Sequence, residues 1–224
     1  MHLLVDLSWA ARYYSDAAAL DKVIGWLHRE HGITSVSGIE PGPMVGQLRR
    51  RIEPEWNVSP STDEDHNAKV DAMAEDVLIA NGCPVYAVGG GDIVDGLATL
   101  TYANTAIMSG RKRARLIDRP RFDGREFHAG ADEVDETTLT VEAITSKVAP
   151  GIRGLGSARA RTIFEQLGPP DAAWSALTRG AMSLKSIPGV PDKVLAEVVA
   201  HLPRISRWVE LYKSWPEVGL QHMG

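Results

Sequence analysis

Short apolar runs alternate with longer amphipathic stretches through the first half of the chain. The runs have the length and the branched apolar content of buried strands. They lie at residues 2–8, 33–39, 84–88 and 114–118. Strands that alternate with helices in this way predict an α/β fold, with a mostly parallel sheet and flanking helices on both faces.

The stretches between these runs carry the start and stop signals of helices. Asp16 is placed to cap a helix over residues 17–31, and Gly32 is placed to end it. The same reasoning predicts helices over residues 62–81 and 92–109.

The pattern changes at about residue 138. From there onward it is helical and is broken at glycine-rich hairpins, and the polar stretch 123–136 is the expected exposed connection. We therefore predict two domains, an α/β domain at residues 1–137 and a helical region at residues 138–224.

Composition narrows the class of protein. The chain has 224 residues, of which 44% are hydrophobic and 24% charged, as in an ordinary soluble globular protein. No apolar run is long enough to span a bilayer, so we expect no membrane association. Asp6 interrupts the first apolar run, which favours a strand over a signal peptide. The single cysteine, Cys83, excludes an intramolecular disulfide and fits a cytoplasmic location.

Charge is distributed unevenly along the chain. The net charge of −5 arises from the first 140 residues, whereas basic residues outnumber acidic ones in the remainder. Two basic clusters stand out, at residues 49–51 and 111–125. A protein that binds the phosphate backbone needs local positive patches of this kind, and the alternative is an ordinary solvated face.

Four acidic residues follow the predicted strands. The carboxyl ends of parallel strands meet at one edge of a sheet, where ligands bind. That edge is expected to hold Asp6, Glu40, Asp92 and Asp95. Carboxylate oxygens suit Mg²⁺ or Mn²⁺, which predicts a metal site. The alternative is that Asp92 only caps a helix and that Glu40 is only a turn residue.

The segment 149–160, APGIRGLGSARA, is the most specific pattern in the chain. Its glycines permit a tight turn, and a helix opens at about Ser157 with unpaired N–H groups that suit a phosphate. The hairpin carbonyls could also hold K⁺. A weaker copy lies at residues 187–193. The alternatives are an ordinary helix connection or a nucleotide-binding loop, and the latter is disfavoured because no strand precedes it and no GKS or GKT follows.

The order of these parts resembles the flap endonuclease / 5′→3′ exonuclease family, which includes the N-terminal nuclease domain of bacterial DNA polymerase I and its phage relatives. The opening LLVDLSWAARYY matches the first strand of the family. LRRRIEPEWN (48–57) resembles "FRxxxYPEYK", VGGGDIVDGLATL (88–100) resembles "xxGYEADDxxGTL", and ITSKVAPGIRGLGSARA (144–160) resembles "DSSDNIPGVPGIGxxTA". The resemblance covers nearly the whole chain and implies a PIN-like nuclease domain followed by a helix–hairpin–helix region.

Part of the family's acidic set is kept in this resemblance. Asp6 and Asp95 stand at metal-binding aspartates, Asp92 replaces a glutamate, and Glu40 replaces an aspartate. Asp6, Asp92 and Asp95 are therefore the expected residual catalytic residues.

The remaining acids are missing. Val94 replaces one aspartate of the "ADD" pair, and Ile144 and Lys147 stand at the two acids of "DxxD". The motif "TGDKD" falls near residues 118–122, with no acid at either aspartate position. Hydrolysis by two metal ions needs both sites, so we expect at most one divalent ion.

The resemblance predicts a DNA-binding protein that prefers branched, flap or end-containing DNA, independently of sequence, and whose nuclease activity is weak or lost. The first alternative is an active Mg²⁺-dependent 5′→3′ exonuclease or flap endonuclease of replication or repair, and the second is an interaction module for replication proteins. The oligomeric state stays open. The expected DNA-binding residues are Arg49, Arg50, Lys147, Gly151, Arg153, Gly154, Gly156, Ser157 and Arg159.

Overall fold

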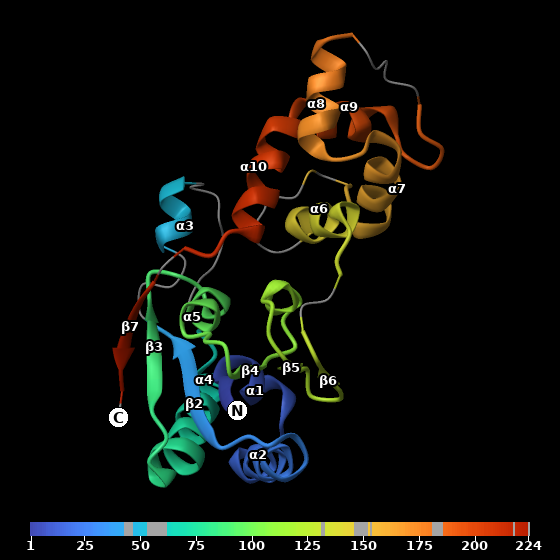
Figure 1. The fold of residues 1–224 in the computed structure, drawn as a ribbon. Helices are drawn as coiled ribbons and strands as arrows, with labels where there is room; N and C mark the ends of the chain where they lie inside the picture. The colour runs from blue at the N-terminus through green and yellow to red at the C-terminus, as the bar shows by residue number, and fades with distance from the viewer. Residues whose placement is uncertain are drawn as a thin grey trace. The chain divides into compact units, whose positions relative to one another are not determined.

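The computed structural model describes residues 1–42, 47–52, 62–130, 133–145, 152, 154–180, 186–216 and 218–223. The chain forms two compact units (Figure 1). The first unit comprises Met1–Ile52, Val58–Asp132 and Trp215–Gly224, and the second comprises Glu53–Asn57 and Glu133–Ser214. Among the described residues, no helix combines the length and the apolar character needed to cross a bilayer.

The first unit is built on a seven-stranded sheet with the order β6-β5-β4-β1-β2-β3-β7. The strands are β1 (His2–Asp6), β2 (Ser35–Pro41), β3 (Val85–Gly89), β4 (Thr105–Met108), β5 (Arg121–Phe122), β6 (Phe127–His128) and β7 (Gly219–His222). Among the described strands, the inner ones pair in parallel, and β6 and β7 at the two edges run antiparallel to their neighbours. The predicted mostly parallel α/β sheet is confirmed.

Helices follow the strands, and capping residues mark where α2 begins and ends. The α-helices of this unit are α1 (Leu7–Tyr13), α2 (Ala17–His31), α3 (Gln47–Ile52), α4 (Glu64–Ala72) and α5 (Ile93–Thr99). The Asp16 carboxylate accepts a hydrogen bond from the Ala19 amide at 2.8 Å, and Gly32 ends α2 with a φ of 65°. The α4 segment continues through a π-helix, η1 (Met73–Leu78), and a 3₁₀ turn, η2 (Ile79–Asn81).

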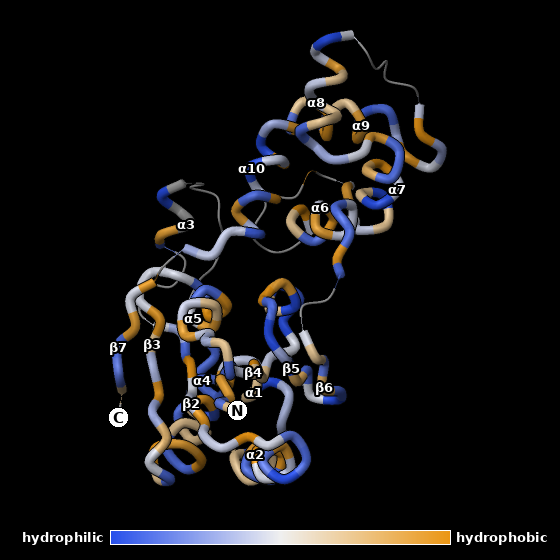
Figure 2. The backbone as a smooth tube through the Cα atoms, in the orientation of Figure 1, coloured by the Kyte–Doolittle hydropathy of each residue, from blue (hydrophilic) through white to orange (hydrophobic). Residues whose placement is uncertain are grey.

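Apolar side chains cover both faces of the sheet. Leu3 and Val5 of β1 face a core that includes Leu20, Leu27 and Met73, from α2 and η1. The alternate residue Leu4 faces a second core, which includes Val88 and Leu97. Leu3, Leu4 and Val5 form a continuous apolar run, as expected for a parallel strand buried on both sides. Polar residues interrupt β2 and β7 (Figure 2).

The fourth strand lies elsewhere than predicted. Residues 112–116 form a 3₁₀ helix, η3 (Lys112–Leu116), and the strand beside β1 is β4, at Thr105–Met108. The helix expected to reach residue 109 ends at Thr99, and a turn precedes β4. All four β4 residues are buried, so the strand lacks the alternation that would separate it from the end of an apolar helix.

The second unit is helical. It contains α6 (Glu136–Thr145), α7 (Ser157–Leu167), α8 (Pro170–Thr178), α9 (Asp192–Ala200) and α10 (Leu202–Lys213). Its core is separate and is centred on Phe164, Val198, Ile205 and Trp208. The units divide between residues 132 and 133, and residues 215–224 return to the first unit, where β7 pairs with β3.

Candidate functional site at the carboxyl end of the sheet

The carboxyl ends of the parallel strands carry the predicted acidic residues. Asp6 is the last residue of β1 and lies beside Ile39 of β2, so that Glu40 follows one step later. Asp92 and Asp95 stand at the start of α5, directly after β3. The loop after β4 reaches the same edge and supplies side chains that the sequence did not assign to it.

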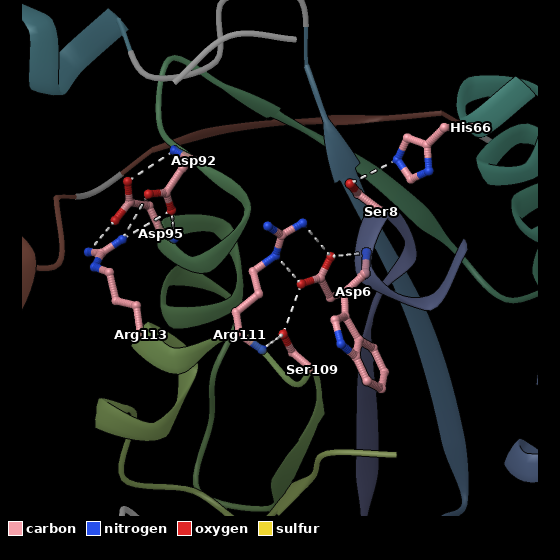
Figure 3. A network of polar contacts seen from close by, with 9 residues as sticks. Asp6, Ser8, His66, Asp92, Asp95, Ser109, Arg111 and Arg113 are labelled. Carbon is pink, nitrogen blue, oxygen red and sulfur yellow. Dashed lines mark hydrogen bonds and ion pairs between the residues drawn. The ribbon is translucent and has the colours of Figure 1, made fainter. Parts of the chain in front are cut away.

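Asp6 is fully buried and is held on all sides. Its carboxylate accepts hydrogen bonds from the Trp9 amide at 2.9 Å and from the Ser109 hydroxyl at 2.8 Å. Arg111 donates to it from Nε at 2.6 Å and from Nη2 at 3.4 Å (Figure 3). Charge-assisted hydrogen bonds of this kind replace those that a buried carboxylate no longer makes with water.

Asp92 and Asp95 form a reciprocal capping box at the start of α5. Each carboxylate accepts the backbone N–H of the other residue at 3.0 Å. Arg113 donates hydrogen bonds from Nη1 to both Asp92 oxygens at 3.0 Å and from Nη2 to Asp95 Oδ1 at 2.7 Å. The Arg113 side chain is only 6% exposed and that of Asp95 is fully buried, so this is an interior ion pair. Asp92 therefore caps α5, as the alternative to a metal site predicted, and it also forms an ion pair with Arg113.

The segment that leads into β7 covers Arg113. The Trp215 ring lies over the guanidinium, with its centre 4.5 Å from the central carbon. Val218 is buried nearby, where a Cβ at Gly91 would approach its Cγ1 to 2.3 Å. The close approach requires glycine at position 91, next to the capping box.

The electrostatics of the site are those of a salt-bridge network. The Asp6 carboxylate, and to a smaller extent Asp92, raise the pKa of Arg111 above its ordinary value. Glu40 is half-buried in β2, and burial together with the Asp71 carboxylate raises its pKa. Within the described part of the chain, no three His, Cys, Asp or Glu side chains form a group that could hold a metal ion. The carboxylate oxygens of Asp6, Asp92 and Asp95 instead accept guanidinium N–H groups.

Arg111 and Arg113 were not predicted as site residues. The sequence placed the "TGDKD" motif near residues 118–122 because it placed the fourth strand at 114–118. Since β4 ends at Met108, the loop after it reads Ser-Gly-Arg-Lys-Arg at 109–113. This loop keeps the glycine and the lysine of the motif and has arginine at both aspartate positions. The sequence SGRKR after the apolar run TAIM is the signal that could have located it.

The glycine-rich hairpin lies in the helical unit. Gly154 adopts a φ of 87°, and α7 begins at Ser157 with Gly156 as its N-cap. Arg159 Nη1 donates to the Gly154 carbonyl at 2.7 Å, so one carbonyl that could face K⁺ already has a partner. The weaker copy has a similar turn, with Gly189 at a φ of 78° before α9.

Several predicted DNA-binding positions lie outside the described residues. These are Lys147, Gly151 and Arg153, together with the side chains of Arg49 and Arg50.

Comparisons with known proteins concern the fold. No family model matches the chain, and no curated protein matches it in sequence. Among solved structures, a pseudo-enzyme-product complex of a bacteriophage T5 D15 flap endonuclease variant with DNA and metal ions has a TM-score of 0.65 and 14% identity, covering 95% of this chain and 88% of that one. The catalytic core of Rad2 in complex with DNA substrate has a TM-score of 0.54 and 14% identity, covering 97% and 78%. The chain therefore has the fold of the flap endonuclease and 5′-exonuclease structures.

Proposed function

We propose that this chain is a DNA-binding protein built on a nuclease fold, in which two arginines stand where metal ions would be needed for cleavage. It binds branched, flap or end-containing DNA and hydrolyses it slowly or not at all. The observation that carries the proposal is the direct bonding of Arg111 to Asp6 and of Arg113 to Asp92 and Asp95.

A guanidinium cannot replace the metal in the reaction. Hydrolysis by two metal ions needs one ion to activate the attacking water and another to stabilise the leaving oxygen. Arginine stays protonated and offers only N–H donors, so it can neutralise a carboxylate or a phosphate but cannot lower the pKa of a bound water as a Lewis acid does. Divalent binding at these oxygens would require the guanidinium groups to leave, which supports at most one weak Mg²⁺ or Mn²⁺ site.

Two features support DNA as the ligand. Solved structures of this fold include complexes with DNA. The hairpin before α7 also presents a helix start with Ser157 and Arg159 nearby, which suits a phosphate group. Contacts of this kind reach the backbone and not the base edges, so the binding is independent of sequence.

The decisive experiment separates binding from cleavage. Wild-type protein should bind a 5′-flap DNA equally well in EDTA and in Mg²⁺ or Mn²⁺, and the labelled flap should stay intact over long incubation. Asp95→Ala is the matched control, because any cleavage that it leaves unchanged comes from a contaminating nuclease. Robust metal-dependent cleavage that Asp95→Ala abolishes would establish the alternative, an active 5′ nuclease. Failure to bind any DNA would refute the proposal and favour a protein-interaction module.

A further inference from the structure

The segment that leads into β7 places a tryptophan at the acidic edge of the sheet. Because β7 runs antiparallel to β3 and Gly219 pairs with Gly89, the last residue of β3, the residues just before Gly219 lie at the carboxyl ends of the parallel strands. Trp215 is in this position, and the centre of its ring is 4.5 Å from the central carbon of the Arg113 guanidinium. The tryptophan therefore stands beside the carboxylates that Arg113 neutralises.

The indole of Trp215 is not part of the apolar core. Val218 and Leu220, from the same segment, pack into the core on this face of the sheet, whereas Trp215 remains 37% exposed. The Arg113 side chain beneath the ring is only 6% exposed, so the exposed area of the indole belongs to its outer side. Within the described part of the chain, no second aromatic ring covers that side. A flat apolar surface is thus left open next to the site.

The ring is held in one orientation before any ligand binds. The attraction between the guanidinium and the ring fixes the inner face. Pro216 follows Trp215 and restricts its backbone to extended conformations, and the pairing of β7 with β3 anchors the chain that comes after. A side chain that is already ordered loses little conformational entropy on binding, so more of its contact energy contributes to affinity.

We infer that the outer face of Trp215 stacks against an unpaired base of the DNA, beside the carboxylates that the two arginines neutralise. An aromatic side chain accepts any base in this way, because every base has a π-face, and the bases of a single strand are free to reach it. Lys112, which precedes Arg113 in η3, is exposed and adds positive charge that suits the backbone of the same strand. The inference rests on the proposed function for the identity of the ligand, and it adds that the DNA is single-stranded at this point.

A tryptophan that only covered the ion pair would behave differently on substitution. Its role would be to exclude water from Arg113, and leucine at position 215 would keep part of that cover. Base stacking instead needs a π-face, which leucine lacks and phenylalanine keeps in part. Trp215→Leu and Trp215→Phe therefore separate the two roles. Trp26→Leu is the matched control, since Trp26 is also 37% exposed in the same unit but lies on α2.

Two single strands of equal length are the probes, an oligothymidylate and an abasic strand that has the same phosphates but no bases. Wild type should bind oligothymidylate about tenfold or more tightly than the abasic strand at the same salt concentration, the size of effect that one stacked base gives. Trp215→Leu should reduce this preference by about tenfold without changing its affinity for the abasic strand. Trp215→Phe should keep part of the preference, and Trp26→Leu should keep all of it.

Fluorine NMR reports the contact directly in protein that carries 5-fluorotryptophan. The Trp215 resonance, assigned by its absence from Trp215→Phe, should shift with oligothymidylate and not with the abasic strand. This readout uses wild-type protein, so it does not depend on how Trp215→Leu folds. A resonance that does not shift, or a Trp215→Leu variant that keeps the full preference, would overturn the inference.

The same titrations separate the inference from the proposed function. Equal affinity of wild type for the two strands, or binding of duplex DNA and of neither single strand, would overturn the inference and leave the proposed function standing. Failure of wild type to bind duplex, flap and single-stranded DNA alike would refute the proposed function and the inference with it.

Discussion

Replacing Arg113 with methionine should destabilise the sheet-containing unit. Methionine keeps much of the side-chain volume against Trp215 but removes the cation that faces Asp92 and Asp95. Removing one partner of a buried ion pair costs about 3–5 kcal/mol, because the remaining charge stays in a medium of low dielectric constant. Asp92 is 17% exposed and the capping hydrogen bonds remain, so we expect the lower part of that range.

Denaturant unfolding measures this cost. The variant and wild type are compared at pH 7 by tryptophan fluorescence and by circular dichroism, with Arg115→Met, from the same 3₁₀ helix η3, as the control. A loss of about 3 kcal/mol is a large part of the stability of a typical domain, so the midpoint should move clearly. A difference between the two variants below about 1 kcal/mol would show that the Arg113 pair contributes little.

Magnesium adds a second test of the same reasoning. In Arg113→Met the two carboxylates become accessible to a divalent ion, whereas in wild type they are occupied by the guanidinium. Mg²⁺ at ten times its Kd should restore about 1.4 kcal/mol to the variant, since the ion binds only the folded state. Wild type should not respond. A response of equal size in both proteins would mean that the ion binds at another site. It would contradict the proposal that Arg113 occupies the position of a metal ion.

Three other substitutions probe Asp123, Tyr14 and the hairpin before α7. Burial of Asp123 opposes its ionisation, but hydrogen bonds from the Glu126 and Arg125 amides and from His128 lower its pKa to about 2. Because this pKa is depressed, the ionised carboxylate stabilises the fold above its ordinary pKa, and this stabilisation disappears as pH falls from about 4 to 2. In acid unfolding curves, Asp123→Asn should therefore destabilise the protein at pH 6 and not at pH 2. Tyr14→Phe should be neutral or stabilise by about 1 kcal/mol in thermal unfolding, because the buried Tyr14 hydroxyl has no hydrogen-bond partner among the described residues; a loss above 2 kcal/mol would mean that it has one. Gly154→Val combined with Arg159→Glu should weaken DNA binding, because valine is strained at a φ of 87° and glutamate reverses the charge at position 159. In a salt titration, the slope of log binding constant against log salt concentration should become shallower by about 0.9 for each phosphate that the variant no longer neutralises. An unchanged slope would refute the role of the hairpin in DNA binding.

The sheet was predictable where apolar runs are bounded by turn residues. Residues 2–8, 33–39 and 84–88 correspond to β1, β2 and β3, because a strand buried on both faces leaves a short, mostly apolar segment in the sequence. The short strands β5 and β6 were not predicted, since two residues of strand carry no periodicity. The strand β7 is mostly exposed and pairs with a strand that lies 130 to 136 residues earlier, so no local pattern in the sequence indicates its partner.

The acidic edge was predictable, but its chemistry was not. Topology alone brings Asp6, Asp92 and Asp95 to the ends of neighbouring strands. The cations that contact these carboxylates depend on where the loop after β4 begins. The predicted strand started nine residues too late in the sequence, so Arg111 and Arg113 were not assigned to that loop. The basic run was therefore interpreted as a DNA-binding cluster, whereas two of its members neutralise the carboxylates of the chain itself.

The return of the chain to the sheet at β7 makes residues 133–214 an insertion within the first unit. A protease that cuts near residue 132 would leave two pieces held together by the backbone pairing of β7 with β3 and by the Trp215 stack on Arg113. Removing the last ten residues would in turn expose the edge of β3, a template for pairing with other chains. A truncated chain that ends at Ser214 should therefore aggregate more readily than one that keeps Gly219–His222, although both retain every helix of the second unit.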